Sequence, residues 1–303
     1  MADDVRAAGT SGSIERVGFF AALMAVLLVA LPTLPAVFFP SNPIVDALLF
    51  VALPYLALIL LVAGLTYRAA GWLAPKQLTG LRTVSIVPNV FGRTDVVKNM
   101  LKRILGFYTL PKMEGDRTLI VGSMLFHYGI WAVLIGHLAM VVPLGMSPGL
   151  HSAVALYLGG VAGSASFVGL LVLAARRVSV PRVRSISYVD DYFAVAILFA
   201  VVASGLVQTL FTRPDYMASV APWLVSLLTF RPELASLSQA GPMTMAHVVI
   251  TLLFIAYVPL GKMTHVVSYL FMPTIAKSGQ RVGDVGIPVE ANPVAPGGGH
   301  DES

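Results

Sequence analysis

The chain has 303 residues, of which 57% are hydrophobic and only 12% are charged, well below the roughly 25% charged residues of a soluble domain. Its formal net charge is +5, an excess of Lys and Arg that in a membrane protein belongs on cytoplasmic loops, so it gives no argument for nucleic-acid binding. The chain contains no cysteine, which excludes disulfides, cysteine-ligated iron–sulfur clusters and covalent c-type haem within it. Composition therefore predicts an all-α, polytopic membrane protein.

Two apolar stretches come first in the chain. Residues 1–16 form a polar N-terminal tail, and residues 17–39 and 44–67 are each long enough to cross a bilayer as a helix. The first stretch is longer than the apolar core of a signal peptide and lacks a clean small-residue cleavage site, so we expect a retained helix, with cleavage as the alternative. Pro54 should kink the second helix, which membrane helices tolerate.

Residues 68–117 form the one long polar segment between spans and are predicted to be a basic cytoplasmic loop. Within it, residues 94–107 can be written as a basic amphipathic helix with one apolar face. Two readings stay open for this helix. It either lies on anionic lipid at the membrane surface or forms a docking surface for a soluble partner.

Four further spans complete the pattern. The glycines of Gly159-Gly160-Val161-Ala162-Gly163 permit close helix packing in the second of them, and Pro259 lies inside the last. A shorter apolar piece at residues 220–230 is too short to cross and is expected at the interface, and residues 273–303 are expected to be a disordered cytoplasmic tail. The four spans are predicted at residues 118–144, 153–175, 192–211 and 243–272.

The distribution of Lys and Arg predicts the orientation of the six spans. The loops 68–117 and 176–184 hold thirteen of these residues, whereas the loops 40–46 and 145–152 hold none and 212–242 holds two. Because Lys and Arg concentrate on the cytoplasmic side, both termini are predicted to be cytoplasmic in a multi-pass protein of the cell (inner) membrane.

Four of the six histidines lie inside two predicted spans: His127 and His137 in one, His247 and His265 in the other. An ionisable side chain at membrane depth is costly and calls for a functional reason. The two spans run in opposite directions, so depth pairs His127 with His265 near the cytoplasmic face and His137 with His247 near the outer face. Facing pairs of neutral imidazoles are typical axial ligands of haem iron, which predicts two haems b.

Helix geometry supports this reading in part. His247 and His265 are about five full turns apart and share one face, while His127 and His137 lie about 80° apart. Along a straight helix, the rise is about 15 Å from His127 to His137 and about 27 Å from His247 to His265. Tilt or a kink at Pro259 must absorb this difference. Two alternatives remain: core histidines that bond between helices, and a proton relay in a non-haem transporter or channel, although the spans hold almost no carboxylates to continue a relay.

At this point the chain resembles the gamma (cytochrome b) subunit of respiratory nitrate reductase and its di-haem relatives in sulfite-reduction-associated and heterodisulfide-reductase-type complexes. In this chain two predicted spans precede the first histidine helix, whereas the nitrate reductase subunit has one. In this respect the chain is more similar to the sulfite-linked and heterodisulfide-linked relatives. The resemblance covers about residues 118–272 and rests on His127-x9-His137, the Gly-Gly-x-x-Gly segment, Arg176-Arg177 with Pro181-Arg182-Val183-Arg184, and His247-x17-His265 with Pro259 and Lys262 between.

The resemblance implies an electron-transfer subunit whose axial ligands are the four paired histidines. It would pass electrons between a membrane quinone, menaquinone or ubiquinone, and a cytoplasmic iron–sulfur subunit. Further subunits would complete the complex and carry the terminal chemistry, so this chain would be the quinone-reactive part of an oxidoreductase.

Two other residues are candidate site residues. Lys262 lies one turn before His265 and could pair with a haem propionate, or simply extend its ammonium to the lipid headgroups. His151 lies at the outer start of the span 153–175, where its imidazole could accept a quinol proton near neutral pH. The alternative for His151 is an ordinary interfacial histidine.

Overall fold

The computed structural model describes residues 42–73, 98, 101–102, 104–107, 116–138, 140–142 and 147–268. Helices and turns make up this part, and no strand occurs in it. The chain divides into two compact units, one from residues 1–68 and 107–266 and the other from residues 69–106 and 267–303. The predicted span 17–39, both tails and most of the loop 68–117 lie outside the described residues, so those predictions stay predictions.

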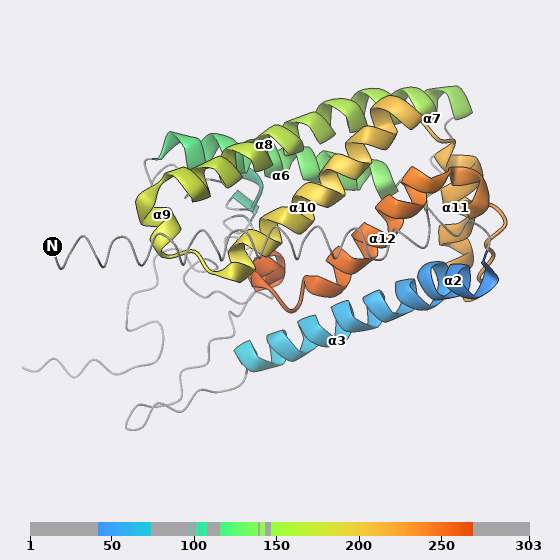
Figure 1. Cartoon of the computed structure of the whole chain (residues 1–303), viewed down its shortest axis with the longest axis horizontal. Helices are drawn as coiled ribbons and strands as arrows, with labels where there is room; N and C mark the ends of the chain where they lie inside the picture. The colour runs from blue at the N-terminus through green and yellow to red at the C-terminus, as the bar shows by residue number, and fades with distance from the viewer. Residues whose placement is uncertain are drawn as a thin grey trace, which may run out of the picture. The chain divides into compact units, whose positions relative to one another are not determined.

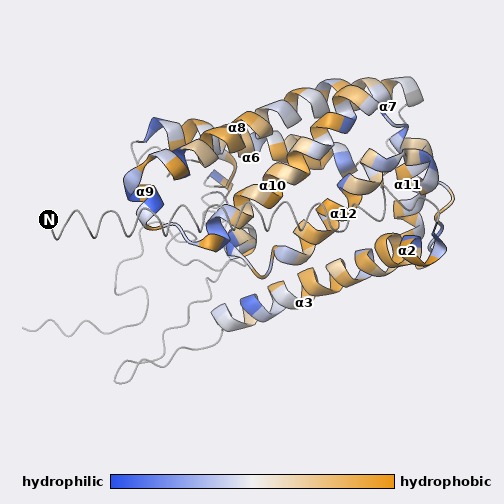
Figure 2. Ribbon diagram, in the orientation of Figure 1, coloured by the Kyte–Doolittle hydropathy of each residue, from blue (hydrophilic) through white to orange (hydrophobic). Residues whose placement is uncertain are grey.

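Within the described ranges, four helices are long and apolar enough to cross a membrane: Pro43–Trp72, Arg117–Leu138, Gly149–Ser179 and Val189–Thr212. Large apolar side chains lie on their outer faces, among them Leu58, Ile59 and Val62 of the first helix. Figure 2 shows hydrophilic residues gathered about α9 (Pro181–Ser185), beyond the end of the long apolar helices. A lipid-facing exterior explains such exposure, which soluble monomers avoid.

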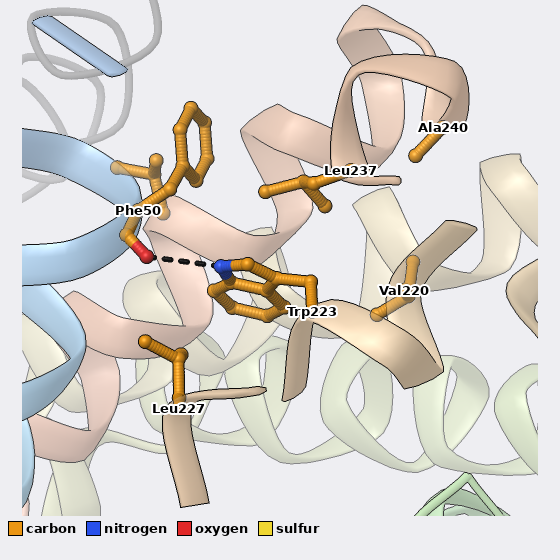
Figure 3. Packing of buried hydrophobic residues seen from close by; sticks show 7 residues of the cluster. Phe50, Val220, Trp223, Leu227, Leu237 and Ala240 are labelled. Carbon is orange, nitrogen blue, oxygen red and sulfur yellow. Dashed lines mark hydrogen bonds between the residues drawn. The ribbon is translucent and has the colours of Figure 1, made fainter. Parts of the chain in front are cut away.

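The first helix consists of α2 (Pro43–Ala47), a π-helical turn η1 (Leu48–Ala52) and α3 (Leu53–Leu73). Pro54 has no N–H to donate to the carbonyl of Phe50 four residues earlier. The indole Nε1 of Trp223 donates to that carbonyl instead, at 2.9 Å (Figure 3). The predicted irregularity at Pro54 therefore serves as an attachment point for α11 (Tyr216–Leu228).

Helix α6 (Arg117–Leu138) packs closely along α8 (Gly160–Ser179), which continues from α7 (Pro148–Val154) and the π-helical turn η2 (Ala155–Gly159). A methyl group at Gly129 would lie 2.6 Å from the carbonyl oxygen of Ala162, and one at Gly169 would lie 2.8 Å from that of Gly122. The two backbones therefore touch, which only small residues allow.

The next elements are α10 (Val189–Val207), η3 (Gln208–Thr212), α11, η4 (Leu237–Ala240) and α12 (Pro242–Tyr257). Helices α6, α8, α10 and α12 lie side by side in that order (Figure 1). Helix α11 has thirteen residues and is therefore too short to cross a membrane, which agrees with the prediction for this region. Its buried face forms one cluster with neighbouring segments: Phe50, Val220, Trp223, Leu227, Leu237, Ala240 and Val249 (Figure 3).

The span predicted at residues 243–272 is interrupted, within its described part, next to Pro259, where a kink was one of the predicted ways to absorb the difference in rise. Helix α12 ends at Tyr257, residues 258–261 form a turn, and a short 3-10 turn η5 (Lys262–Thr264) leads into α13 (His265–Ser268). Pro259 cannot donate a helical hydrogen bond, and Gly261 is extended, at φ −99° and ψ −168°. Arg68 of α3 donates to the carbonyl oxygens of Pro259 and Leu260 at 3.2 and 3.1 Å. These two carbonyl groups of the broken helix therefore have hydrogen-bond donors.

Candidate functional site

The structure brings the four membrane histidines together as two pairs. His127 of α6 faces His265 at the start of α13, with ring centroids 6.2 Å apart and planes at 75°. His137 of α6 faces His247 of α12, with ring centroids 6.5 Å apart and planes at 35°. These are the pairs that antiparallel depth order predicts, and the break after Tyr257 is where the mismatch in helical rise between the two helices is absorbed.

The spacing of the rings fits axial ligation of one metal by each pair. Metal–imidazole bonds are about 2 Å long, and about 1 Å more separates each bonded nitrogen from its ring centroid, so two rings on one metal have centroids about 6 Å apart. Among the described residues, no three His, Cys, Asp or Glu side chains cluster to hold a metal ion. Two imidazoles from the protein suit a haem, whose macrocycle brings its own four nitrogens.

The hydrogen bonds of the rings also suit this role. In three of the four histidines, Nδ1 lies within hydrogen-bond distance of a backbone carbonyl oxygen, which can only accept, so Nδ1 carries the proton and the lone pair is on Nε2. Such a bond is the usual support of a metal-ligating histidine. The three contacts are His127 to Ser123 at 2.8 Å, His137 to Val133 at 2.7 Å, and His265 to Lys262 at 3.2 Å.

His247 reaches the same tautomer through a hydroxyl. Its Nδ1 lies 2.9 Å from Oγ of Ser204 on α10, and that hydroxyl also lies 2.7 Å from the carbonyl oxygen of Ala200. Because the hydroxyl has one proton, which it donates to the carbonyl, its lone pair accepts from Nδ1–H of His247. Gly205 makes room for the ring, since a methyl group there would lie 3.0 Å from Cε1 of His247.

Aromatic rings lie around His127, which with His265 forms the pair predicted nearer the cytoplasm, called the inner pair below. Phe107 and Phe126 each have their ring centroid 5.0 Å from that of His127, and the indole of Trp131 lies 6.3 Å away. Phe107 has φ of +47°, a backbone conformation that a bulky residue rarely adopts. No pattern in the sequence pointed to Phe107, because it lies twenty residues before His127 and outside any predicted span.

Lys262 has a protein partner that the sequence reading missed. Its ammonium nitrogen lies 2.7 and 2.8 Å from the two carboxylate oxygens of Asp191 at the start of α10. Asp191 is only 8% exposed, and a guanidinium nitrogen of Arg177 lies 3.5 Å from it. The predicted propionate contact of Lys262 stays a prediction, and this ion pair competes with it.

A cavity of about 340 Å³ adjoins the pair His137 and His247, called the outer pair below after its predicted depth, and its lining includes both of them and His151. His151 of α7 is 8% exposed. The volume and mostly apolar lining are typical of a small-molecule site. Four lining oxygens are buried without a hydrogen-bond partner in the part of the chain that the structure describes: Gln208 Oε1, Tyr216 Oη, Thr244 Oγ1 and Thr251 Oγ1.

Two π-helical turns, η2 and η3, contribute to the wall of this cavity. Leu158 and Gly159 of η2 and Gln208 and Thr209 of η3 all line it, and the two turns contact each other. Turns of this kind are rare and occur often at functional sites. Their polar lining residues were missed by sequence reading, because single Gln and Thr residues in apolar helices carry no pattern.

A model of the nitrate reductase gamma subunit family matches residues 111–277, which include all four paired histidines. The nitrate reductase gamma chain of Bacillus subtilis is 31% identical over 164 residues, covering 50% of this chain and 73% of that protein. An Hdr-like menaquinol oxidoreductase cytochrome b-like subunit of Archaeoglobus fulgidus is 28% identical over 260 residues, covering 74% and 77%. The respiratory nitrate reductase 2 gamma chain of Escherichia coli is 29% identical over 201 residues, covering 61% and 89%.

Proposed function

The chain belongs to the nitrate reductase gamma subunit family, and from this premise we propose that it is the membrane cytochrome b subunit of a respiratory redox complex. It would pass electrons between membrane quinone and a cytoplasmic iron–sulfur subunit through two bis-histidine haems b. The observation that carries this proposal is the presence of two facing histidine pairs with ring centroids 6.2 and 6.5 Å apart.

In this proposal, His127 and His265 hold the inner haem and His137 and His247 hold the outer one. Each bound haem b supplies a one-electron carrier whose potential depends on its ligands and their hydrogen bonds. The protein's part is to keep all four rings in the tautomer with the lone pair on Nε2, through the Nδ1 contacts described above.

The cavity beside the outer pair is the proposed quinone site. His151 lines it together with His137 and His247, and a neutral imidazole can accept a proton from a bound quinol. A quinol oxidised there would release its protons on the outer side. Electrons would then leave by way of the inner histidine pair, so charge would cross the membrane.

The orientation follows from the basic loops. We propose six spans with both termini cytoplasmic, because Lys and Arg concentrate in the loops 68–117 and 176–184. Lys98, Lys102, Arg182 and Arg184 are all exposed. They would face the iron–sulfur subunit, which must carry the clusters because this chain has no cysteine.

The absorption spectrum of the purified native complex tests the proposal. We expect b-type haem bands and two haems per copy of this chain, reduced by a quinol and re-oxidised by a quinone. A chain without haem would overturn the proposal in favour of a transporter or channel that uses its histidines for protons.

Cross-linking tests the docking side. Photo-reactive groups at cysteines introduced in place of Lys98 and Lys102 should capture an iron–sulfur subunit in intact membranes. Arg231 is exposed on the opposite predicted side, and the same label there is the matched control. Capture of that subunit from position 231 alone would reverse the proposed orientation.

A further inference from the structure

The turn between α12 and α13 is tied at both ends to the first turn of α10. At one end, the hydroxyl of Tyr257, the last residue of α12, donates to a carboxylate oxygen of Asp190. At the other end, the ammonium of Lys262 donates to both oxygens of the adjacent Asp191, at 2.7 and 2.8 Å. Two consecutive carboxylates therefore bracket the segment in which the helix is broken.

This attachment bears directly on His265. The segment 258–261 is not helical, so the regular series of hydrogen bonds that holds a ligand in mid-helix is interrupted before His265. The carbonyl oxygen of Lys262 lies 3.2 Å from Nδ1 of His265. Lys262 thus begins the 3-10 turn that leads into α13, and its carbonyl oxygen is a hydrogen-bond acceptor for the His265 ring.

Asp191 is well held itself. Its second carboxylate oxygen accepts from the backbone N–H of Tyr188 at 2.9 Å, which closes a capping box at the start of α10. Arg177, at the end of α8, adds a second cation at 3.5 Å. A charge that is 8% exposed and bound on three sides is a rigid point of attachment, and removing its charge leaves Lys262 without its counter-ion.

We propose that Asp190 and Asp191 are positioning residues that hold the turn 258–264 and so keep His265 opposite His127. Asp191 acts through Lys262, and Asp190 acts through Tyr257. The outer pair needs no such attachment, because His247 lies inside the regular part of α12. The role in haem binding rests on the proposed function, whereas the placement of the His265 side chain opposite that of His127 is a property of the protein alone.

The first test measures this placement of positions 127 and 265 without haem. The chain has no cysteine, so the variant with His127→Cys and His265→Cys contains a single thiol pair for a short bifunctional thiol cross-linker. We expect efficient intramolecular cross-linking in this background and a several-fold loss when Asp191→Asn is added. A second pair, His137→Cys with His247→Cys, should cross-link equally well with and without Asp191→Asn.

Asp116→Asn is the matched control. Asp116 is ion-paired to Arg176 at 2.8 Å, and hydrogen bonds from Thr118 and Arg176 hold its pKa well below the ordinary value, so it is a charged partner. Among the described residues it makes no hydrogen bond or ion pair with the turn, and its replacement should leave the cross-linking at 127 and 265 unchanged. An equal loss in Asp116→Asn and Asp191→Asn would overturn the specific role of Asp191.

The second test uses the haem-loaded complex. Asp191→Asn and Lys262→Met should each lower the inner haem content and shift its EPR signal, the double variant should do no more than either single change, and Asp191→Glu should restore the signal. Unchanged inner haem in Asp191→Asn with a two-haem native protein would overturn the positioning role. Absence of haem from the native protein would overturn the proposed function instead. The cross-linking result would still decide whether Asp191 keeps position 265 opposite position 127.

Discussion

The inner and outer histidine pairs share one helix, α6, but their second ligands are delivered in different ways. His247 lies inside α12, and its ring fits between Ser204 and Gly205 of α10. His265 follows a break in the helix and depends on a turn that side chains hold in place. One pair is thus set by helix packing, and the other by ion pairs and hydrogen bonds to a turn.

This difference predicts which substitutions should disturb one histidine pair and leave the other intact. A change in the size of small residues on α10 should disturb the outer pair and leave the inner pair intact. A change in charge at the start of α10 should do the reverse, although both segments belong to one helix. Four predictions test the comparison, from the largest expected effect to the smallest, and bound haem is the quantity measured in the first three.

Removal of a ring should have the largest effect. His127→Ala and His265→Ala should each remove the same inner haem, and His137→Ala and His247→Ala should each remove the same outer haem, because a single axial imidazole is left at each site. The measurement is haem content and the low-temperature spectrum of the purified complex.

Double variants give the internal control. His127→Ala with His265→Ala should lose no more haem than either single change, whereas His127→Ala with His247→Ala should lose both haems. Retention of two haems in the second double variant would show that the pairs do not bind haem as proposed.

Overfilling the outer site should have the next largest effect. Gly205→Val places carbon atoms where the ring of His247 lies, since even a methyl group there would be 3.0 Å from Cε1. Overpacking costs about 1–3 kcal/mol, so the outer haem should be largely lost and the inner haem kept. Gly149→Val is the control, because a Cβ there meets no atom within 4 Å in the described structure. Equal loss of both haems in Gly205→Val would mean that the two pairs are not independent.

Loss of a supporting hydrogen bond should have a smaller effect. Ser204→Ala removes the acceptor of Nδ1–H of His247, and loss of such a partner typically weakens metal binding by about 10–100-fold. We expect partial outer haem content that rises when haem is supplied in excess. Ser238→Ala, at an exposed site, should bind haem normally. A fully loaded outer site in Ser204→Ala at limiting haem would contradict this role of the hydroxyl.

The sequence predicted the helices of the core and the histidine pairs because both depend on regular patterns. Apolar stretches of sufficient length specify membrane helices, and opposite helix directions specify which histidines share a depth. Tilt or a kink at Pro259 was predicted, but a break that ends the helix at Tyr257 was not, since Pro is tolerated in membrane helices. The signals for it were the mismatch between rises of about 15 and 27 Å and the presence of Gly261 and Lys262 soon after Pro259.

The attachments of the turn and the polar lining of the cavity could not be predicted. Asp191 precedes Lys262 by seventy-one residues, and no local pattern joins them. Gln208, Thr244 and Thr251 come together only because α10 and α12 pack side by side and η3 ends α10 with a π-helical turn. Such sites depend on long-range packing, which composition and periodicity do not encode.

The smallest effect on bound haem is expected at His151, where only the rate of reduction should change. His151 is 8% exposed and lines the cavity beside His137 and His247, so its imidazole can take a proton from a quinol bound there. Positioned bases contribute about 10²–10⁴-fold. Because the site lies in a cavity that neighbouring polar groups also line, we expect His151→Ala to slow quinol-driven reduction by about tenfold, below the usual range of such effects.

The measurement is stopped-flow reduction of the complex by a quinol, with haem content checked for each variant. Ser152→Ala is the control, because Ser152 is the exposed neighbour of His151 on α7 and its loss should not change the rate. If His151→Ala kept both haems and the native rate, proton acceptance would lie elsewhere. If in addition His247→Ala, lacking the outer haem, were still reduced by quinol at the native rate, the quinone site would belong beside the inner pair, and the two regions would exchange their proposed roles.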